Sequence, residues 1–214
     1  DQAGNIVSQQ PTDEIFTAGV YTVIATSNLG CVSFSKEITI TESSIATITP
    51  EDVLITDNSD NNSITVITAN QNLGIGDYEF SLDDISGPFQ DSPSFTRVSP
   101  GKHTIFVREK NNCGIAQVTV FVFGFPNFFT PNNDGKNDVW NVQGVDFSLF
   151  PESNIYIYDR YGKMLINFKA DNIGWDGVYN NIEALSSDYW YLAQITDSNG
   201  TTREFKGHFS LIRK

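Results

Sequence analysis

The residues best suited to chemistry in this chain lie in one oxygen-rich loop and in the last eight positions. Side-chain oxygens crowd the stretch from Asn132 to Asp138, around a single turn glycine. The candidate ligands for Ca²⁺ in this loop are Asn132, Asp134, Asn137 and Asp138. The loop lacks a closing bidentate Glu, however, and Asn and Asp also stabilise turns by bonding their own backbone. Calcium is therefore a possible cofactor here, and a capped turn is the alternative.

The second set of candidate residues forms the run from Gly207 to Lys214, in which Phe209 and Leu211 share one face of an extended strand. At a sheet edge, such a strand could pair with a strand of a partner, and its two terminal cations could meet an acidic surface. An ordinary closing strand is the alternative. The candidate partner-binding residues are Gly207, His208, Phe209, Ser210, Leu211, Ile212, Arg213 and Lys214.

Aromatic side chains are dense in the last ninety residues, where they could bind sugar or fill a core. Core packing is the better explanation for Trp140 and Trp175, because a domain with few Leu and one Met must bury aromatic area. Trp190 is more open to a carbohydrate role. Its neighbours Tyr189 and Tyr191 point to the other face of the same strand.

The sequence offers little support for catalysis, and we expect no enzyme activity. The two histidines, His103 and His208, have no nucleophile motif around them. The two cysteines, Cys31 and Cys113, are flanked by turn residues without a nearby His. Acidic residues are plentiful, but their concentration at turns explains them without a pair of catalytic carboxylates.

The charge of the chain bounds its partners. A net charge of -13 argues against nucleic acid, which needs clustered Lys and Arg. Residues 1–124 hold 15 acidic against 5 basic side chains, and residues 125–214 hold 11 against 8. No run of eighteen apolar residues exists, so we expect no transmembrane segment. The first residues also lack the pattern of a signal peptide, and a fragment of a longer chain is the favoured explanation.

An internal repeat divides the chain. Shifting the sequence by 82 residues aligns residues 17–41 with residues 99–123 without a gap, and each copy reads as a β-hairpin. The expected domains are a truncated C-terminal half of an Ig-like repeat (1–42), a complete Ig-like repeat (43–124) and a different C-terminal domain (125–214). The two cysteines fall at equivalent positions of the copies, so a disulfide between them is not an obvious pairing.

Short alternating runs predict an all-β fold, with tandem Ig-like antiparallel β-sandwiches followed by a C-terminal β-sandwich. Two further hairpins are expected in the last domain, around the turns Arg160-Tyr161-Gly162 and Asp197-Ser198-Asn199-Gly200. Arg160 and Tyr161 are a second candidate partner-binding site, because recognition residues often lie at exposed hairpin tips.

The C-terminal ninety residues resemble a known family through FPNFFTPNNDGKNDVW, IYIYDRYGKML, GWDGVYN, DYWYLAQI and EFKGHFSLIRK, which follow one another in order. They resemble the type B C-terminal sorting domain of the Bacteroidetes type IX secretion system, also called the gliding-motility-associated C-terminal domain. The sequence differs from this family at Ile212: in the family a basic pair follows the Leu directly, whereas here Ile212 lies between Leu211 and the basic pair. The stretch from Tyr78 to Gly114 resembles the surface-adhesin repeats that often precede this domain.

The resemblance implies an export signal and cell-surface anchor of a large secreted adhesin that serves gliding motility or attachment. The implied partners are the type IX translocon with its shuttle barrel, and an outer-membrane barrel protein of the PorP/SprF type. The implied location is the outer face of the outer membrane. The alternative function is an adhesive, carbohydrate-binding β-sandwich that uses exposed aromatics.

Overall fold

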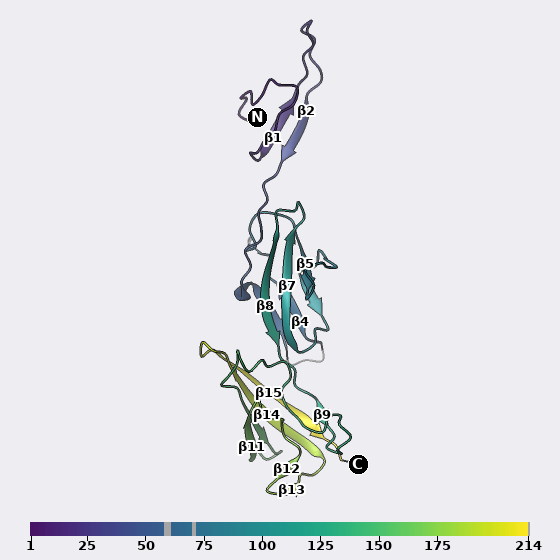
Figure 1. Ribbon diagram of the computed structural model, residues 1–214, viewed down its shortest axis with the longest axis vertical. Coiled ribbons are helices and arrows are strands. Elements are labelled where there is room, and N and C mark those ends of the chain that lie inside the picture. The colour runs from purple at the N-terminus through teal and green to yellow at the C-terminus, as the bar shows by residue number, and fades with distance from the viewer. Residues whose placement is uncertain (58–60, 70–71, 214) are drawn as a thin grey trace.

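The chain folds almost entirely into strands and turns. The computed structural model describes residues 1–57, 61–69 and 72–213. Figure 1 shows three bodies arranged end to end, with the N-terminus at one end of the molecule and the C-terminus near the other. Within the described ranges there is no α-helix, and the one 3-10 helix is η1 (Pro50–Asp52). The predicted all-β fold with antiparallel sheets is confirmed.

Both copies of the repeated segment form a hairpin with the same register. Their strands are β1 (Gly19–Val23), β2 (Lys36–Ile40), β7 (Gly101–Glu109) and β8 (Ile115–Val122). Gly19 lies opposite Ile40, and Gly101 lies opposite Val122, so adding 82 to either residue of the first pair gives the second. The hairpins predicted from the repeat are therefore confirmed, including the pairing of their strands.

The two hairpins differ in what covers them. Val23 and Ile38 are 50% and 45% exposed in the first copy, whereas the equivalent Ile105 and Val120 are 0% and 3% exposed in the second. In the second copy a facing sheet supplies the missing contacts. The apolar residues of the repeat therefore need a second layer to become a core.

The middle body is a β-sandwich of two three-stranded antiparallel sheets. One sheet has the order β3-β4-β6 and the other the order β5-β7-β8. The strands not yet given are β3 (Val53–Thr56), β4 (Ser63–Val66), β5 (Tyr78–Leu82) and β6 (Ser94–Thr96). Ile64, Ile105 and Val122 are buried between the layers, and in β4 the buried residues alternate with less buried ones as in a sheet with one face on the core.

The C-terminal body is built on one five-stranded sheet with the order β11-β10-β14-β15-β9 (Figure 1). Its strands are β9 (Phe128–Phe129), β10 (Asn154–Tyr158), β11 (Met164–Lys169), β14 (Ser187–Thr196) and β15 (Thr202–Leu211). A separate two-stranded sheet is formed by β12 (Val178–Tyr179) and β13 (Ile182–Glu183). Loops that carry Trp140, Phe150 and Trp175 cover the inner face of the large sheet and close its core.

Both hairpins expected in this body are present. Strand β10 ends at Tyr158, just before the predicted turn, because Asp159 turns the chain. The Oδ1 atom of Asp159 accepts hydrogen bonds from the amides of Tyr161 (2.8 Å) and Lys163 (3.0 Å). An Asp side chain that bonds the following amides in this way favours a turn over a continued strand.

The junction between the middle and C-terminal bodies is packed. Phe123 is fully buried and belongs to the C-terminal core, together with the partly buried Phe121 of β8. Both rings contact Phe150 edge to face, at centroid distances of 5.3 and 5.1 Å. The expected boundary between residues 124 and 125 stays a prediction, and any cut there removes two aromatic residues from the second core.

Candidate functional site

The candidate terminal strand is part of the sheet interior at its C-terminal end. Strand β15 pairs with β14 along its whole length and with β9 at Ser210 and Leu211 only. The amide of Ser210 donates to the carbonyl of Asn127 at 2.9 Å, and the amide of Ile212 donates to that of Phe129 at 3.0 Å. The last two residues of the strand therefore already have a neighbour on each side.

Phe209 is the centre of the aromatic core. Its ring is stacked on Trp140 with a centroid distance of 4.1 Å and an interplanar angle of 15°. It also contacts Phe129, Trp175 and Tyr189 at 5.8 to 6.2 Å. Phe209 and Leu211 are both buried. They share one face, as expected, and that face packs inside the domain.

Arg213 is held by backbone carbonyls of three separate loops. Its guanidinium donates to Ala184 (3.1 Å), Gly177 (3.0 Å) and Pro131 (3.4 Å). Its own amide donates to Oγ of Ser186 at 2.9 Å. Arg213 thus fastens the end of the chain to the domain. The other predicted cation, Lys214, lies outside the described residues.

The remaining members of the terminal run differ in exposure. His208 and Ile212 are exposed, and Ser210 donates from Oγ to Oδ1 of Asp188 at 2.6 Å. Gly207 lies opposite Tyr191, and a Cβ atom at Gly207 would come within 2.6 Å of the Tyr191 hydroxyl. Between Gly207 and Arg213, the exposed residues are therefore His208 and Ile212.

The motif from Gly174 to Gly177 supports this same end of the chain. Trp175 pairs with Trp140 through two backbone hydrogen bonds of 2.9 Å, and both indoles are 0% exposed. Gly177 has a φ of +79°, and a Cβ atom there would lie 2.8 Å from Cδ1 of Leu211 and 3.0 Å from Arg213. The core role predicted for Trp140 and Trp175 is confirmed, and Gly177 makes room for the terminal residues.

The hairpin tip lies beside the terminal strand. Nη2 of Arg160 donates to Oγ of Ser187 at 3.2 Å, and Ser187 is the residue of β14 that pairs with Leu211. Tyr161 is 85% exposed. The structure thus brings together two sets of predicted partner-binding residues that are some fifty positions apart in the sequence. Leu185 and Ile182, which the sequence did not single out, add exposed apolar side chains close to Ser186 and Glu183, which contact Arg213.

The oxygen-rich loop bonds to itself. Asp138 accepts backbone amides from Asn132 (3.0 Å), Asn133 (2.6 Å) and Gly135 (2.8 Å). Burial raises the pKa of the Asp138 carboxyl, but these amide donors outweigh it and lower the pKa from its ordinary value of 3.8. Asp134 accepts the amide of Lys136 at 2.8 Å in the same manner. This is the geometry of the capped turn.

Residues 1–57, 61–69 and 72–213 contain no group of three or more His, Cys, Asp or Glu side chains placed to hold a metal ion. Asn132 directs its Oδ1 to the amide of Asp134, and the carbonyl of Asn137 accepts the amide of Thr130. Several oxygens of the candidate ligands are therefore already bonded to nearby backbone amides, and calcium binding stays a prediction.

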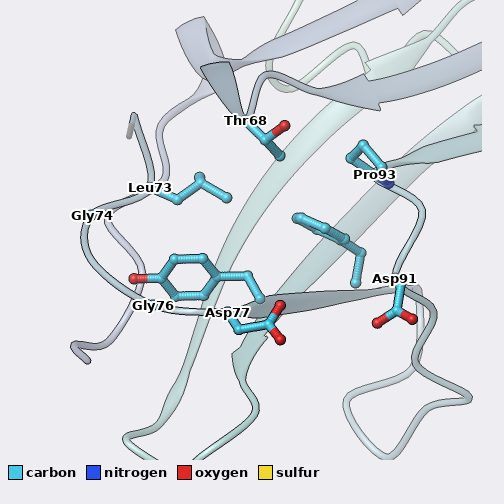
Figure 2. Close-up of a pocket in the computed structure, with 9 residues that line it drawn as sticks. Thr68, Leu73, Gly74, Gly76, Asp77, Asp91 and Pro93 are labelled. Atoms are coloured by element: carbon cyan, nitrogen blue, oxygen red, sulfur yellow. The ribbon is translucent and has the colours of Figure 1, made fainter. Parts of the chain in front are cut away.

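A cavity of about 290 Å³ lies in the middle body, at the end of the sandwich near Gly74 and Gly76. Figure 2 shows Asp77 and Asp91 at one end of it and Thr68 at the other. Nζ of Lys110 bridges the two carboxylates, at 3.0 Å from Asp77 and 2.7 Å from Asp91. The two carboxylates thus share one ammonium of the protein, and the described residues that line the cavity include no His or Cys.

The histidine of the middle body has a structural place. Nδ1 of His103 lies 2.7 Å from Oδ2 of Asp83, and its Nε2 lies 2.8 Å from the carbonyl of Ser99. The side chain is buried. Both ring nitrogens are occupied within the fold, so His103 is a satisfied core histidine.

One contact that the sequence did not indicate joins the middle and C-terminal bodies. Arg203 of β15 forms a close ion pair with Asp57, whose side chain is nearly buried. The guanidinium also lies over the rings of Phe123 (4.8 Å) and Phe205 (5.0 Å). No sequence signal could have paired residues 146 positions apart in the chain. The contact makes the junction a defined interface.

The buried tryptophan pair, the glycine motif and the closing strand all belong to one continuous segment of the chain. Residues 123–211 match the CHU_C type IX secretion signal domain. The predicted resemblance is thereby confirmed for this part of the chain, which we call the signal domain. A domain of this family directs type IX secretion, places its protein at the cell surface or in the medium, and is a non-catalytic kind of module. Membership of this family implies that such a domain interacts with the secretion machinery.

Solved structures similar to this chain include the BSP domain of a biofilm associated protein, at 14% identity and a TM-score of 0.26, which covers 76% of this chain and 29% of that one. Another is dimeric latent PorU from Porphyromonas gingivalis, at 13% identity and a TM-score of 0.29, with 76% and 20% covered. The chain thus spans less than a third of either protein. At these scores, neither likeness carries an argument.

A tetra-tandem repeat from the extending region of a large adhesion protein is similar at 14% identity and a TM-score of 0.23, with 91% of this chain and 57% of that one covered. No curated protein matches the chain. No helix of the described residues is long and apolar enough to cross a membrane.

Proposed function

We propose that this chain is the export signal and cell-surface anchor of a large secreted adhesin. The observation that carries the proposal is the match of residues 123–211 to the type IX secretion signal domain. After export, the signal domain would hold the protein at the outer face of the outer membrane. Its partners would be the shuttle barrel of the translocon and an outer-membrane barrel protein of the PorP/SprF type. The upstream Ig-like repeats would carry the adhesive function.

The docking surface is proposed at the end of the sheet where the hairpin tip meets the terminal strand. Tyr161, Ile212 and Leu185 are exposed apolar side chains at this end, with the guanidinium of Arg160 beside them. Aromatic and aliphatic side chains with an adjoining Arg are the typical composition of a protein interface. Phe209 and Leu211, by contrast, would act indirectly, because they hold the exposed residues in place.

The test is surface display of a fluorescent reporter fused to residues 1–214 in a Bacteroidetes host with type IX secretion. The double variant Tyr161→Glu and Ile212→Glu adds two charges to the proposed surface without touching the core. We expect the reporter to be lost from the cell surface. The matched control is Leu29→Glu, because Leu29 is as exposed as Tyr161 but lies in the N-terminal hairpin.

The variant should be displayed normally if the proposal is wrong, and it must melt like the parent protein for the test to count. Deleting Gly207 to Lys214 is a poorer test, since it also removes Phe209 and Leu211 from the core. Loss of export after that deletion would therefore report unfolding as readily as a lost recognition site.

A further inference from the structure

The outer face of the five-stranded sheet carries aromatic side chains in register. Residues on this face alternate with the core residues of β10, β14 and β15. Tyr158 lies opposite Trp190, and Trp190 lies opposite His208, so three rings follow one another across three strands. The next row along the strands contains Tyr156, Leu192 and Lys206. The two rows form a band, mostly of aromatic and aliphatic side chains, on the face directed away from the core.

The band is accessible from solvent, most of all at Trp190 and His208. Pairing of β14 with β10 and with β15 is continuous, and the register shift between β10 and β11 lies at Ile157 and Tyr158. Neighbouring strands are about 4.8 Å apart, which sets the spacing of the rings within a row. The rings of Trp190 and His208 have a centroid distance of 6.1 Å and an interplanar angle of 42°. Trp190 is 41% exposed, whereas the other two tryptophans are fully buried.

Three charged side chains lie in or beside the band on the same face. Nζ of Lys206 lies 2.7 Å from Oε1 of Glu204, and Nε2 of Gln194 donates to Oε2 of the same Glu at 3.3 Å. On the other side, Asp188 accepts the hydroxyl of Ser210. The band is therefore bordered by hydrogen-bonding groups, and the one ammonium and two carboxylates give it a net charge of -1.

We propose that this face binds a neutral polysaccharide chain. The flat side of a sugar ring exposes C–H groups, which pack on aromatic rings, and its hydroxyl groups project from the rim, where they meet amide, carboxylate and ammonium groups. A neutral polymer is favoured over an anionic one, because Lys206 is already paired with Glu204 and the carboxylate of Asp188 would repel an anion. Binding here is separate from the proposed docking of the signal domain, and each can fail alone.

The experiment is affinity electrophoresis of residues 1–214 in gels that contain a soluble neutral glucan, xylan or mannan. We expect at least one of these polymers to retard the protein. Trp190→Ala and Tyr158→Ala should each reduce the apparent affinity at least tenfold. Tyr161→Ala is the matched control and should migrate like the parent protein, because its ring is exposed but lies at the hairpin tip.

A second readout uses the fluorescence of Trp190. Since Trp140 and Trp175 are buried, acrylamide quenching of the parent protein reports mainly on Trp190, and a bound polymer should reduce it. Three results would overturn the proposal: no retardation by any neutral polymer, retardation that survives in Trp190→Ala, or retardation by anionic polymers alone. A normal melting curve for Trp190→Ala confirms that the variant is folded.

Discussion

Truncating two neighbouring residues of the terminal strand should change the stability of the signal domain by very different amounts. Phe209 and His208 are adjacent, but Phe209 is buried among five aromatic rings and His208 faces solvent. A buried phenylalanine removes about 150–250 Å² from water, which at about 25 cal/mol per Å² corresponds to about 4–6 kcal/mol. The alanine in Phe209→Ala keeps part of this buried area, so the free energy of unfolding should fall by about 3–5 kcal/mol, the usual range for truncating a buried phenylalanine.

His208→Ala is the matched variant, for which a change within about 0.5 kcal/mol is expected because the side chain lies on the surface. Urea unfolding of residues 1–214, followed by fluorescence of the buried Trp140 and Trp175, measures the signal domain in both variants. Equal midpoints for the two variants would refute the assignment of Phe209 to the centre of the core. Secretion of the same variants then separates the two roles, because only Phe209→Ala should lose export through unfolding.

Three further variants test the contacts at the end of the chain and in the oxygen-rich loop. Gly177→Ala should destabilise the domain by about 1–3 kcal/mol more than Gly200→Ala, because both have positive φ but only Gly177 faces Leu211; equal melting temperatures would contradict this. Arg213→Lys keeps the charge but loses the planar guanidinium that donates to several carbonyls, so the free energy of unfolding should fall by about 1.5–3 kcal/mol. An unchanged melting temperature would contradict this role of Arg213. The pKa of Asp138 is lower in the folded state, so the stability that its carboxylate contributes is complete above pH 3.8 and is lost as the pH falls further. Asp138→Ala should therefore flatten the acidic part of a plot of melting temperature against pH. A curve for the variant that runs parallel to that of the parent protein would speak against the loop geometry.

The sequence predicted the parts of the fold that depend on local patterns. Alternating runs predicted the long strands, the 82-residue shift predicted two hairpins with one register, and the turn at Arg160-Tyr161-Gly162 followed from its residue types. Trp190 was placed on the face opposite Tyr189 and Tyr191 by strand periodicity alone, and the burial of the three residues agrees. Local periodicity is sufficient here because each strand has one buried face.

Local patterns did not predict the long-range contacts that complete the fold. Strand β9 has only two residues, and it exists because β15 offers a neighbour 82 positions away. Arg213 looked like a free cation in the sequence, since nothing local indicates that carbonyls of three loops meet its guanidinium. The pair of Arg203 and Asp57 depends on how two bodies pack. Such contacts depend on tertiary structure, and local patterns in a single sequence do not reveal them.

The parallel pairing of β9 with the end of β15 has a mechanical consequence. The chain enters the signal domain just before β9, and it leaves the sheet just after β15, so entry and exit lie on adjacent strands that run in the same direction. If an adhesive repeat is pulled while the far end of the domain is held, the two strands are drawn past each other along their length. The hydrogen bonds from Ser210 and Ile212 to β9 would then be loaded in shear, all together, and would not open one after another. The aromatic core that contains Phe209 and Leu211 would have to be disrupted at the same time. We therefore expect the signal domain, through which the protein would be attached, to resist unfolding under tension.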